Sequence, residues 1–155
     1  MAATTHPTLV TCTVCGTKNR VPGAASGTPH CGSCHAPLPW VADAVDGTFA
    51  QVAETASVPV LVYLWAAWCG PCRMVSPALE QLARDFAGKV KLVKVNVDDA
   101  PGIASRFAVQ GVPTLLVTDR GEIAARQTGA APAPVLRTWL EQALASAGAA
   151  TQEGS

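Results

Sequence analysis

Six cysteines, arranged as three C-x-x-C pairs, are the residues of this chain best suited to chemistry. The pairs are CTVC, CGSC and CGPC, at residues 12–15, 31–34 and 69–72. Cysteine pairs at this spacing either bind a metal such as zinc or exchange electrons as a dithiol and a disulfide. Because the surroundings of the three pairs differ, the sequence predicts two kinds of site.

The first two pairs fit a tetrahedral metal site. Fifteen residues separate CTVC from CGSC, a gap within the spacing typical of four-cysteine zinc sites. Each pair directs two thiolates at one point, and four thiolates complete the coordination of the metal. We therefore expect one structural zinc ion, held by Cys12, Cys15, Cys31 and Cys34.

Three alternatives to this zinc site stay open at the level of sequence. Four unligated thiols would leave about 40 residues with neither a core nor a metal to stabilise them. CGSCH at 31–35 also fits the C-x-x-C-H pattern of haem attachment, although a haem there would not explain CTVC. His30 or His35 is a further candidate zinc ligand, but four cysteines already suffice.

The third pair lies where an apolar run, VLVYLWAAW at 60–68, meets a helical pattern. Cys69 would then begin a helix, where free backbone N–H groups and the helix dipole favour a thiolate. Pro71 suits the first turn, and Cys72 lies within disulfide reach on the same helical face. We expect Cys69 to be exposed and to attack, and Cys72 to be recessed and to resolve. A second metal site is the alternative, but no further pair exists to complete it.

From about Trp40 onward, the pattern predicts an α/β domain with a mixed central sheet. The expected order is short helix, strand, helix, strand, helix, strand, strand, helix. Apolar runs place three of the strands at 57–67, 90–97 and 112–118, and TDRGE at 118–122 joins the fourth as a hairpin.

We expect three parts: a zinc-binding module at 1–39, the α/β domain at 40–147, and a flexible tail at 148–155. Eleven Lys and Arg residues balance eleven Asp and Glu residues, so charge predicts neither nucleic acid nor an anionic membrane as a partner. The longest apolar stretch, 58–67, has about ten residues and is too short to span a bilayer. The first residues lack the pattern of a secretory signal, which favours a cytoplasmic location with reduced thiols.

Three motifs in the main domain resemble those of the thioredoxins: WCGPCR at 68–73, KVNVD at 94–98 and GVPT at 111–114. CTVCGTKNRVP followed by CGSC resembles the N-terminal zinc motif of the second bacterial thioredoxin type. The resemblance implies a thioredoxin fold, reduction of protein disulfides, and recharging by NADPH through thioredoxin reductase. We also expect a monomer whose partners are this reductase and disulfide-bearing proteins.

The resemblance assigns roles around the third pair. It makes Cys69 the nucleophile and Cys72 the resolving thiol. Trp68 matches an exposed indole beside the site, and Gly70 and Pro71 match the dipeptide of the reducing members. These roles agree with the chemistry expected from the helix start.

Other positions match the family further from the cysteines. Val112-Pro113 matches a cis-proline loop that offers backbone groups to an extended substrate segment. Pro77 matches a proline that bends the active-site helix. Gly111 and Gly129 match glycines near the substrate surface. For Trp65, ordinary packing is the expected role.

One departure concerns proton transfer. The family usually carries a buried Asp six residues before the nucleophile, where this chain has Tyr63, while the nearby Lys94 is retained. A phenol with a pKa near 10 is neutral at pH 7 and a poor base. Tyr63 and Lys94 are therefore candidate proton-relay residues, with either a partly desolvated Lys94 or a water carrying the proton.

Two functional alternatives accompany protein-disulfide reduction. One is a disulfide oxidant or isomerase, which the reduction potential would distinguish. The other is a redox-switched binding or chaperone-like module, because four zinc-bound thiolates can be oxidised.

Overall fold

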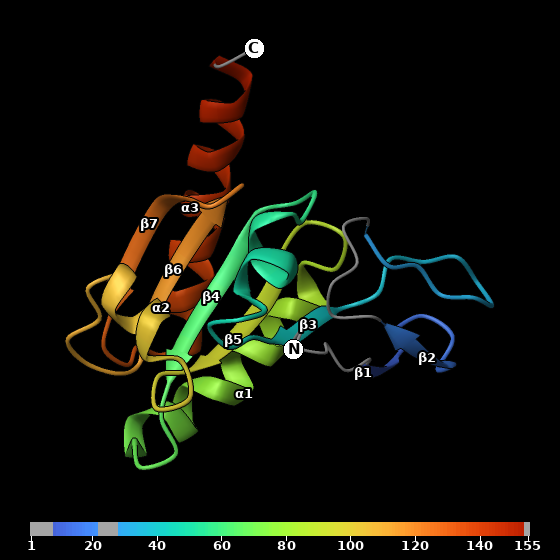
Figure 1. Ribbon diagram of the computed structural model, residues 1–155. Helices are drawn as coiled ribbons and strands as arrows, with labels where there is room; N and C mark the ends of the chain where they lie inside the picture. Colours follow the sequence, from blue (N-terminus) through green and yellow to red (C-terminus); the bar gives the residue numbers. More distant parts are fainter. Residues whose placement is uncertain (1–7, 22–27, 154–155) are drawn as a thin grey trace.

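A five-stranded mixed sheet forms the centre of the molecule in the computed structural model, which describes residues 8–21 and 28–153 (Figure 1). Its strand order is β3-β5-β4-β6-β7. The strands are β3 (Trp40–Asp43), β4 (Val60–Trp65), β5 (Lys91–Asn96), β6 (Thr114–Asp119) and β7 (Glu122–Thr128). β3 and β4 run parallel to β5, whereas β6 and β7 pair antiparallel. This topology confirms the predicted mixed sheet.

Helices cover both faces of the sheet. They are the π-helix η1 (Ala50–Glu54), α1 (Gly70–Asp85), α2 (Pro101–Arg106) and α3 (Ala133–Glu153). Apolar side chains of α1 and α3 pack in one cluster, and those of η1 and α2 pack in the other. The order of helices and strands after residue 48 is the one that the sequence predicts.

Strand β4 is the centre of this arrangement. Leu61 and Tyr63 face the cluster under α1 and α3, while Val60, Val62 and Leu64 face the opposite cluster. Alternate residues of a strand point to opposite faces, so a strand covered on both faces must be apolar throughout. This requirement explains the unbroken apolar run that precedes Cys69.

The N-terminal part forms an antiparallel hairpin of β1 (Thr8–Thr11) and β2 (Lys18–Val21) beside edge strand β3 (Figure 1). Val10, Val21 and Leu38 are buried in the same cluster as Trp40. The sequence analysis did not predict β1, β2 or β3, because strands of four residues are too short to show a clear period. The boundary proposed at residue 39 stays a prediction.

The β6–β7 connection confirms the predicted hairpin. Arg120 and Gly121 form the turn, with φ values of 53° and 87°. Positive φ at both central residues matches the right-handed twist of the two strands. Glycine adopts this conformation without strain, which explains Gly121 at the second position.

Helix α3 continues through residues 148–153, which the sequence analysis assigned to a flexible tail. Alanine has the highest helix propensity of all residues, so Ala149 and Ala150 favour continuation of the helix, whereas Gly148 does not. The flexibility of the tail stays a prediction. Among the described residues, no helix combines the length and apolarity needed to cross a bilayer.

Lys91 on β5 is a charged residue in the core, with none of its surface exposed. Its ammonium group lies 4.3 Å from the centroid of the Trp40 ring and donates a hydrogen bond to the carbonyl of Val52. Burial penalises the charged form and lowers the pKa of Lys91 to about 8. The fold therefore includes one group that destabilises it when protonated.

Replacing this lysine tests the cost of its charge. Between pH 8 and its ordinary pKa of 10.5, the unfolded chain binds more protons than the folded chain, so stability rises with pH. We expect Lys91→Met to raise the free energy of unfolding at pH 7 by up to about 3 kcal/mol, an advantage that shrinks towards pH 10.5. Urea unfolding at several pH values measures it, with the exposed Lys89→Met as control. A difference that stays constant with pH would contradict the assignment.

Candidate active site

Cys69 and Cys72 lie at the start of α1 and form a disulfide, with their Cα atoms 5.4 Å apart. Cys69 is the N-cap residue, in an extended conformation, and its Sγ accepts a hydrogen bond of 3.2 Å from the backbone N–H of Cys72. Pro71 occupies the first turn, where its missing N–H has no partner to lose. The structure thus confirms the predicted helix start at the third cysteine pair.

The predicted exposure of Cys69 is wrong for this disulfide form. Cys69 is only 4% exposed and Cys72 is 2% exposed, because both pack in the cluster beneath α1. Solvent access therefore does not distinguish the two sulfurs here. The helix start does: an N–H donor and the helix dipole favour negative charge on Cys69 when the bond is reduced.

Trp68 is an exposed aromatic residue at this site, with 71% of its surface accessible. Its indole Nε1–H donates a hydrogen bond of 2.9 Å to Asp98 Oδ2. This contact holds an apolar ring at the surface immediately before the disulfide. Asp98 lies in the KVNVD motif, but the sequence analysis assigned it no partner.

The Val112-Pro113 bond is cis, and Val112 packs against the cluster that contains both cysteines. The structure therefore places this loop against the cluster that contains the disulfide. The carbonyl of Pro113 accepts a hydrogen bond of 2.9 Å from Gly129 N–H, where Gly129 has a φ of 93°. Gly129 thus has a conformational reason to be glycine at this position.

Tyr63 lies under the helical turn that carries Cys72. It is 1% exposed, and its hydroxyl donates a 3.0 Å hydrogen bond to the carbonyl of Cys72. Ser76 Oγ lies 2.8 Å from the same hydroxyl and 2.9 Å from the same carbonyl. Burial raises the pKa of Tyr63 above its ordinary value, so the phenol is neutral at pH 7. The sequence analysis missed Ser76, because serine in a helix gives no signal of a partner.

Lys94 pairs with Tyr63 across the β4–β5 ladder. Its Nζ lies 2.8 Å from Glu80 Oε1, and a quarter of its side chain is exposed. The ammonium group is therefore in an ion pair rather than isolated among valines. Glu80, on α1, is the second residue near this site that the sequence analysis did not identify.

Two other sequence expectations concern the surroundings of the disulfide. Trp65 is half-buried and packs on the same cluster as Cys72, which agrees with ordinary packing. Pro77 lies inside α1, which continues to Asp85. Gly111 is exposed and accepts a hydrogen bond of 2.6 Å from the Thr114 hydroxyl at its carbonyl.

The four N-terminal cysteines come together in a cluster, with all four Sγ atoms within 4.8 Å of one another. Cys12 and Cys34 are 3.5 Å apart at their sulfurs, as are Cys15 and Cys31. Four thiolates at about 2.3 Å from a tetrahedral zinc ion would be about 3.8 Å apart. The donor set and its spacing therefore fit one metal ion.

The backbone around the cluster has the same form at both pairs. Gly16 and His35 each have positive φ and donate their N–H to the carbonyl of the first cysteine of the preceding pair. Val14 N–H and Ser33 N–H lie 3.4 Å from Cys12 Sγ and Cys31 Sγ. Such N–H donors favour thiolates and orient them towards a common point.

The pKa values of the thiols in the cluster shift in different directions, since that of Cys15 is lowered and that of Cys34 is raised. Backbone N–H groups of Cys34 and Ser33 lower the pKa of Cys31 to about 6. Asn19 of β2 binds the second pair, donating from Nδ2 to Cys31 Sγ at 3.5 Å and accepting at Oδ1 from Gly32 N–H at 3.0 Å. The sequence analysis did not single out Asn19.

The histidines beside the cluster do not join it. His30 and His35 are exposed, and His30 Nδ1 lies 2.9 Å from the carbonyl of Thr28. Within the described residues, the metal-binding group consists of four cysteines. This arrangement favours a four-thiolate site over the alternatives with histidine or haem.

A helix-capping disulfide after a central strand, with a cis-proline loop packed beside it, defines a thiol–disulfide oxidoreductase. Residues 40–142 match the family model described as Thioredoxin, and the chain belongs to the thioredoxin family. The four-cysteine cluster precedes the matched range.

Curated relatives agree with this assignment. The chain is 44% identical over 97 residues to a thioredoxin of Haemophilus influenzae, covering 63% of this chain and 91% of the relative. It is 43% identical over 103 residues to thioredoxin 1 of a Nostoc species, covering 66% of this chain and 96% of the relative. A thioredoxin of Pyropia yezoensis is 39% identical over 102 residues, covering 66% and 95%.

Proposed function

We propose that this protein is a cytoplasmic, monomeric, zinc-containing thioredoxin of the second bacterial type that reduces protein disulfides. The observation that carries the proposal is the Cys69–Cys72 disulfide at the start of α1, in a chain that also gathers four further cysteines. Its partners are disulfide-bearing proteins and a thioredoxin reductase that supplies electrons from NADPH. The proposed parts are the zinc module at 1–39, the catalytic domain at 40–147 and the tail at 148–155.

The proposed reaction is a pair of thiol–disulfide exchanges. The Cys69 thiolate attacks one sulfur of the client disulfide, which forms a mixed disulfide and releases one client thiolate. The Cys72 thiolate then attacks Cys69 Sγ, which releases the second client thiolate and leaves the Cys69–Cys72 disulfide. Two electrons thus pass from the protein to the client, and the reductase returns two from NADPH.

Surface groups around the disulfide suit an extended client segment. Trp68 offers an exposed apolar ring, and Val112-Pro113 lies beside the cysteines with a cis peptide bond. Backbone groups of such a loop can pair with a client strand, which gives affinity without selecting particular side chains. The exposed Gly70 leaves open space on the helix side of the site.

Zinc is the metal that we propose for Cys12, Cys15, Cys31 and Cys34. Zinc favours tetrahedral thiolate coordination, and a closed four-thiolate sphere stabilises structure rather than catalysing a reaction. Because Cys12 and Cys31 are buried in a cluster that also contains Trp40, holding these ligands also holds the N-terminal hairpin on the main domain.

The proton of Cys72 is proposed to leave by a route other than a buried carboxylate. Tyr63 is neutral and hydrogen-bonded to the Cys72 carbonyl, so it positions the turn and does not act as a base. Two acceptors remain: a water that reaches the site, or Lys94 beside Tyr63 on β5, which would first have to release a proton because its ammonium group is paired with Glu80. Resolution should therefore accelerate as pH rises.

A second candidate function is a redox-switched binding module. The sulfurs of Cys12 and Cys34, and those of Cys15 and Cys31, already lie 3.5 Å apart. Oxidation of these pairs to disulfides would remove the ligands of the metal and disturb the cluster around Val10 and Leu38. Client binding that requires oxidation and survives loss of Cys69 would favour this function.

A reduction potential of the Cys69–Cys72 pair in the oxidising range would instead favour a third function, that of a disulfide oxidant or isomerase.

The two cysteines should differ when each is replaced by serine. We expect Cys69→Ser to abolish NADPH-coupled disulfide reduction, because the attacking thiolate is lost. Cys72→Ser should still attack but accumulate a mixed disulfide, because no second thiol releases the client. Intact-mass measurement after mixing with a disulfide substrate detects that adduct. Identical adduct formation by both variants would refute the assigned roles.

Metal analysis tests the zinc site on the full chain. We expect about one zinc per chain, retained when Cys69 and Cys72 are both replaced by serine as a control. Cys34→Ser changes an exposed ligand and should weaken zinc binding by at least about tenfold, measured by competition with a chromogenic chelator. Stoichiometric, equally tight zinc in Cys34→Ser would defeat the proposed ligand set.

Tyr63→Asp tests the proton route. A carboxylate at this position should speed resolution of the mixed disulfide at pH 7 by roughly tenfold or more, and burial of a carboxyl should lower stability by about 1–3 kcal/mol. Tyr63→Asn is the matched control, because asparagine has the same shape as aspartate but no basic group. Single-turnover rates across pH, beside urea midpoints, measure both effects.

Lys94→Met separates the two remaining proton routes. A slower resolution step at pH 7 would assign the proton to Lys94, whereas an unchanged rate would assign it to water. If Tyr63→Asp resolves no faster than Tyr63→Asn, position 63 is not a relay site.

A further inference from the structure

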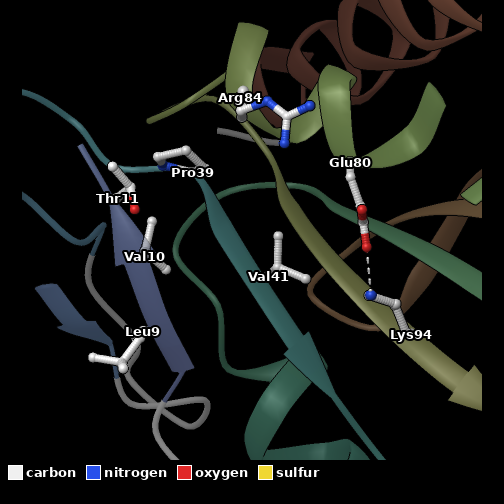
Figure 2. A pocket seen from close by; sticks show the side chains of 8 residues that line it. All are labelled: Leu9, Val10, Thr11, Pro39, Val41, Glu80, Arg84 and Lys94. Carbon is white, nitrogen blue, oxygen red and sulfur yellow. Dashed lines mark hydrogen bonds and ion pairs between the residues drawn. The ribbon is translucent and has the colours of Figure 1, made fainter. Parts of the chain in front are cut away.

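A cavity of about 340 Å³ lies where the N-terminal hairpin meets the main domain (Figure 2). Strand β1 forms one side, edge strand β3 forms the floor, and α1 with β5 forms the other side. Pockets that bind small molecules occupy roughly 300–1,000 Å³ and commonly lie between structural units. Size and location therefore both suit a ligand.

One half of the cavity is apolar. The residues that line this half include Leu9 of β1, Val41 of β3, and Pro39, which directly precedes β3. Leu9 is 67% exposed and therefore offers apolar surface to a ligand. A ligand that covers Leu9 would remove apolar surface from water and gain free energy by the hydrophobic effect.

The other half of the cavity carries three charged side chains. Glu80 and Lys94 form an ion pair at 2.8 Å, so their charges offset each other (Figure 2). Arg84 donates from Nη2 to Gln81 Oε1 at 2.8 Å, and within the described part of the chain it has no carboxylate partner. Asp43, which pairs with Lys94 across the β3–β5 ladder, does not line the cavity. This end therefore has a net charge of one positive unit.

We infer that this cavity binds a small amphipathic carboxylate. The apolar body of the ligand would lie against Leu9 and Val41, and its carboxylate would accept hydrogen bonds from Arg84. A guanidinium has five N–H donors in a fixed fork, so one bond to Gln81 leaves donors for a carboxylate. Arg84 lies twelve residues beyond Cys72 on α1, about 18 Å along the helix axis, so this site is separate from the disulfide.

Three probes with the same six-carbon body test the inference on the full chain: hexanoate, 1-hexanol and hexylamine. Two-dimensional NMR titration follows the backbone signals of Leu9 and Val41 and the side-chain signal of Arg84. We expect saturable shifts at these residues, with hexanoate binding about fivefold more tightly than hexanol, which corresponds to about 1 kcal/mol. Hexylammonium should bind most weakly.

Three exposed positions, Leu9, Arg73 and Arg84, supply variants that are expected to keep the fold. Arg84→Gln should reduce the affinity for hexanoate to the affinity for hexanol. Arg73→Gln removes an equal charge from the same helix and should leave both affinities unchanged. Leu9→Ser should weaken binding of hexanoate and hexanol alike. Equal affinities for the three probes, an unchanged preference in Arg84→Gln, or shifts that never saturate would each overturn the inference.

Discussion

Burial of β4 on both faces is the constraint on which the rest of the structure depends. Because neither face meets solvent, the side chains of Val60–Leu64 must be hydrophobic. The reactive cysteines therefore lie beyond the end of the strand. The chain then turns at Cys69 into α1, where the N–H of Cys72 donates to the sulfur of Cys69. The strand determines where the thiol lies, and the helix start determines its charge preference.

The same burial explains how Tyr63 is accommodated where related proteins usually place an acid. A carboxylate at this depth would be costly without a partner, whereas a phenol has one polar atom to satisfy. Ser76 and the carbonyl of Cys72 satisfy it. Tyr63 thus provides no basic group, but its hydrogen bond fixes the turn that carries Cys72. The charge of Lys94 nearby is neutralised by an ion pair with Glu80.

Two of the four N-terminal cysteines are part of the hydrophobic core of the main domain. Cys12 and Cys31 are buried in the cluster that contains Val10, Leu38 and Trp40, while Cys15 and Cys34 face solvent. The two buried cysteines therefore link this group of thiols to packing shared with the sheet. The cavity between β1 and β3 lies at this junction, where the two parts meet without filling the space completely.

The sequence by itself determined the features that depend on local spacing. Three C-x-x-C pairs, the helix start at Cys69, the apolar runs that became β4, β5 and β6, and the turn at Arg120 all follow from residues close together in the chain. Tertiary structure alone decided the burial of Cys69, the Tyr63–Ser76 contact, the Lys94–Glu80 ion pair and the short strands at the N-terminus. These features join segments distant in sequence, and hydrophobic periodicity shows which face of an element is buried but not which partner covers it.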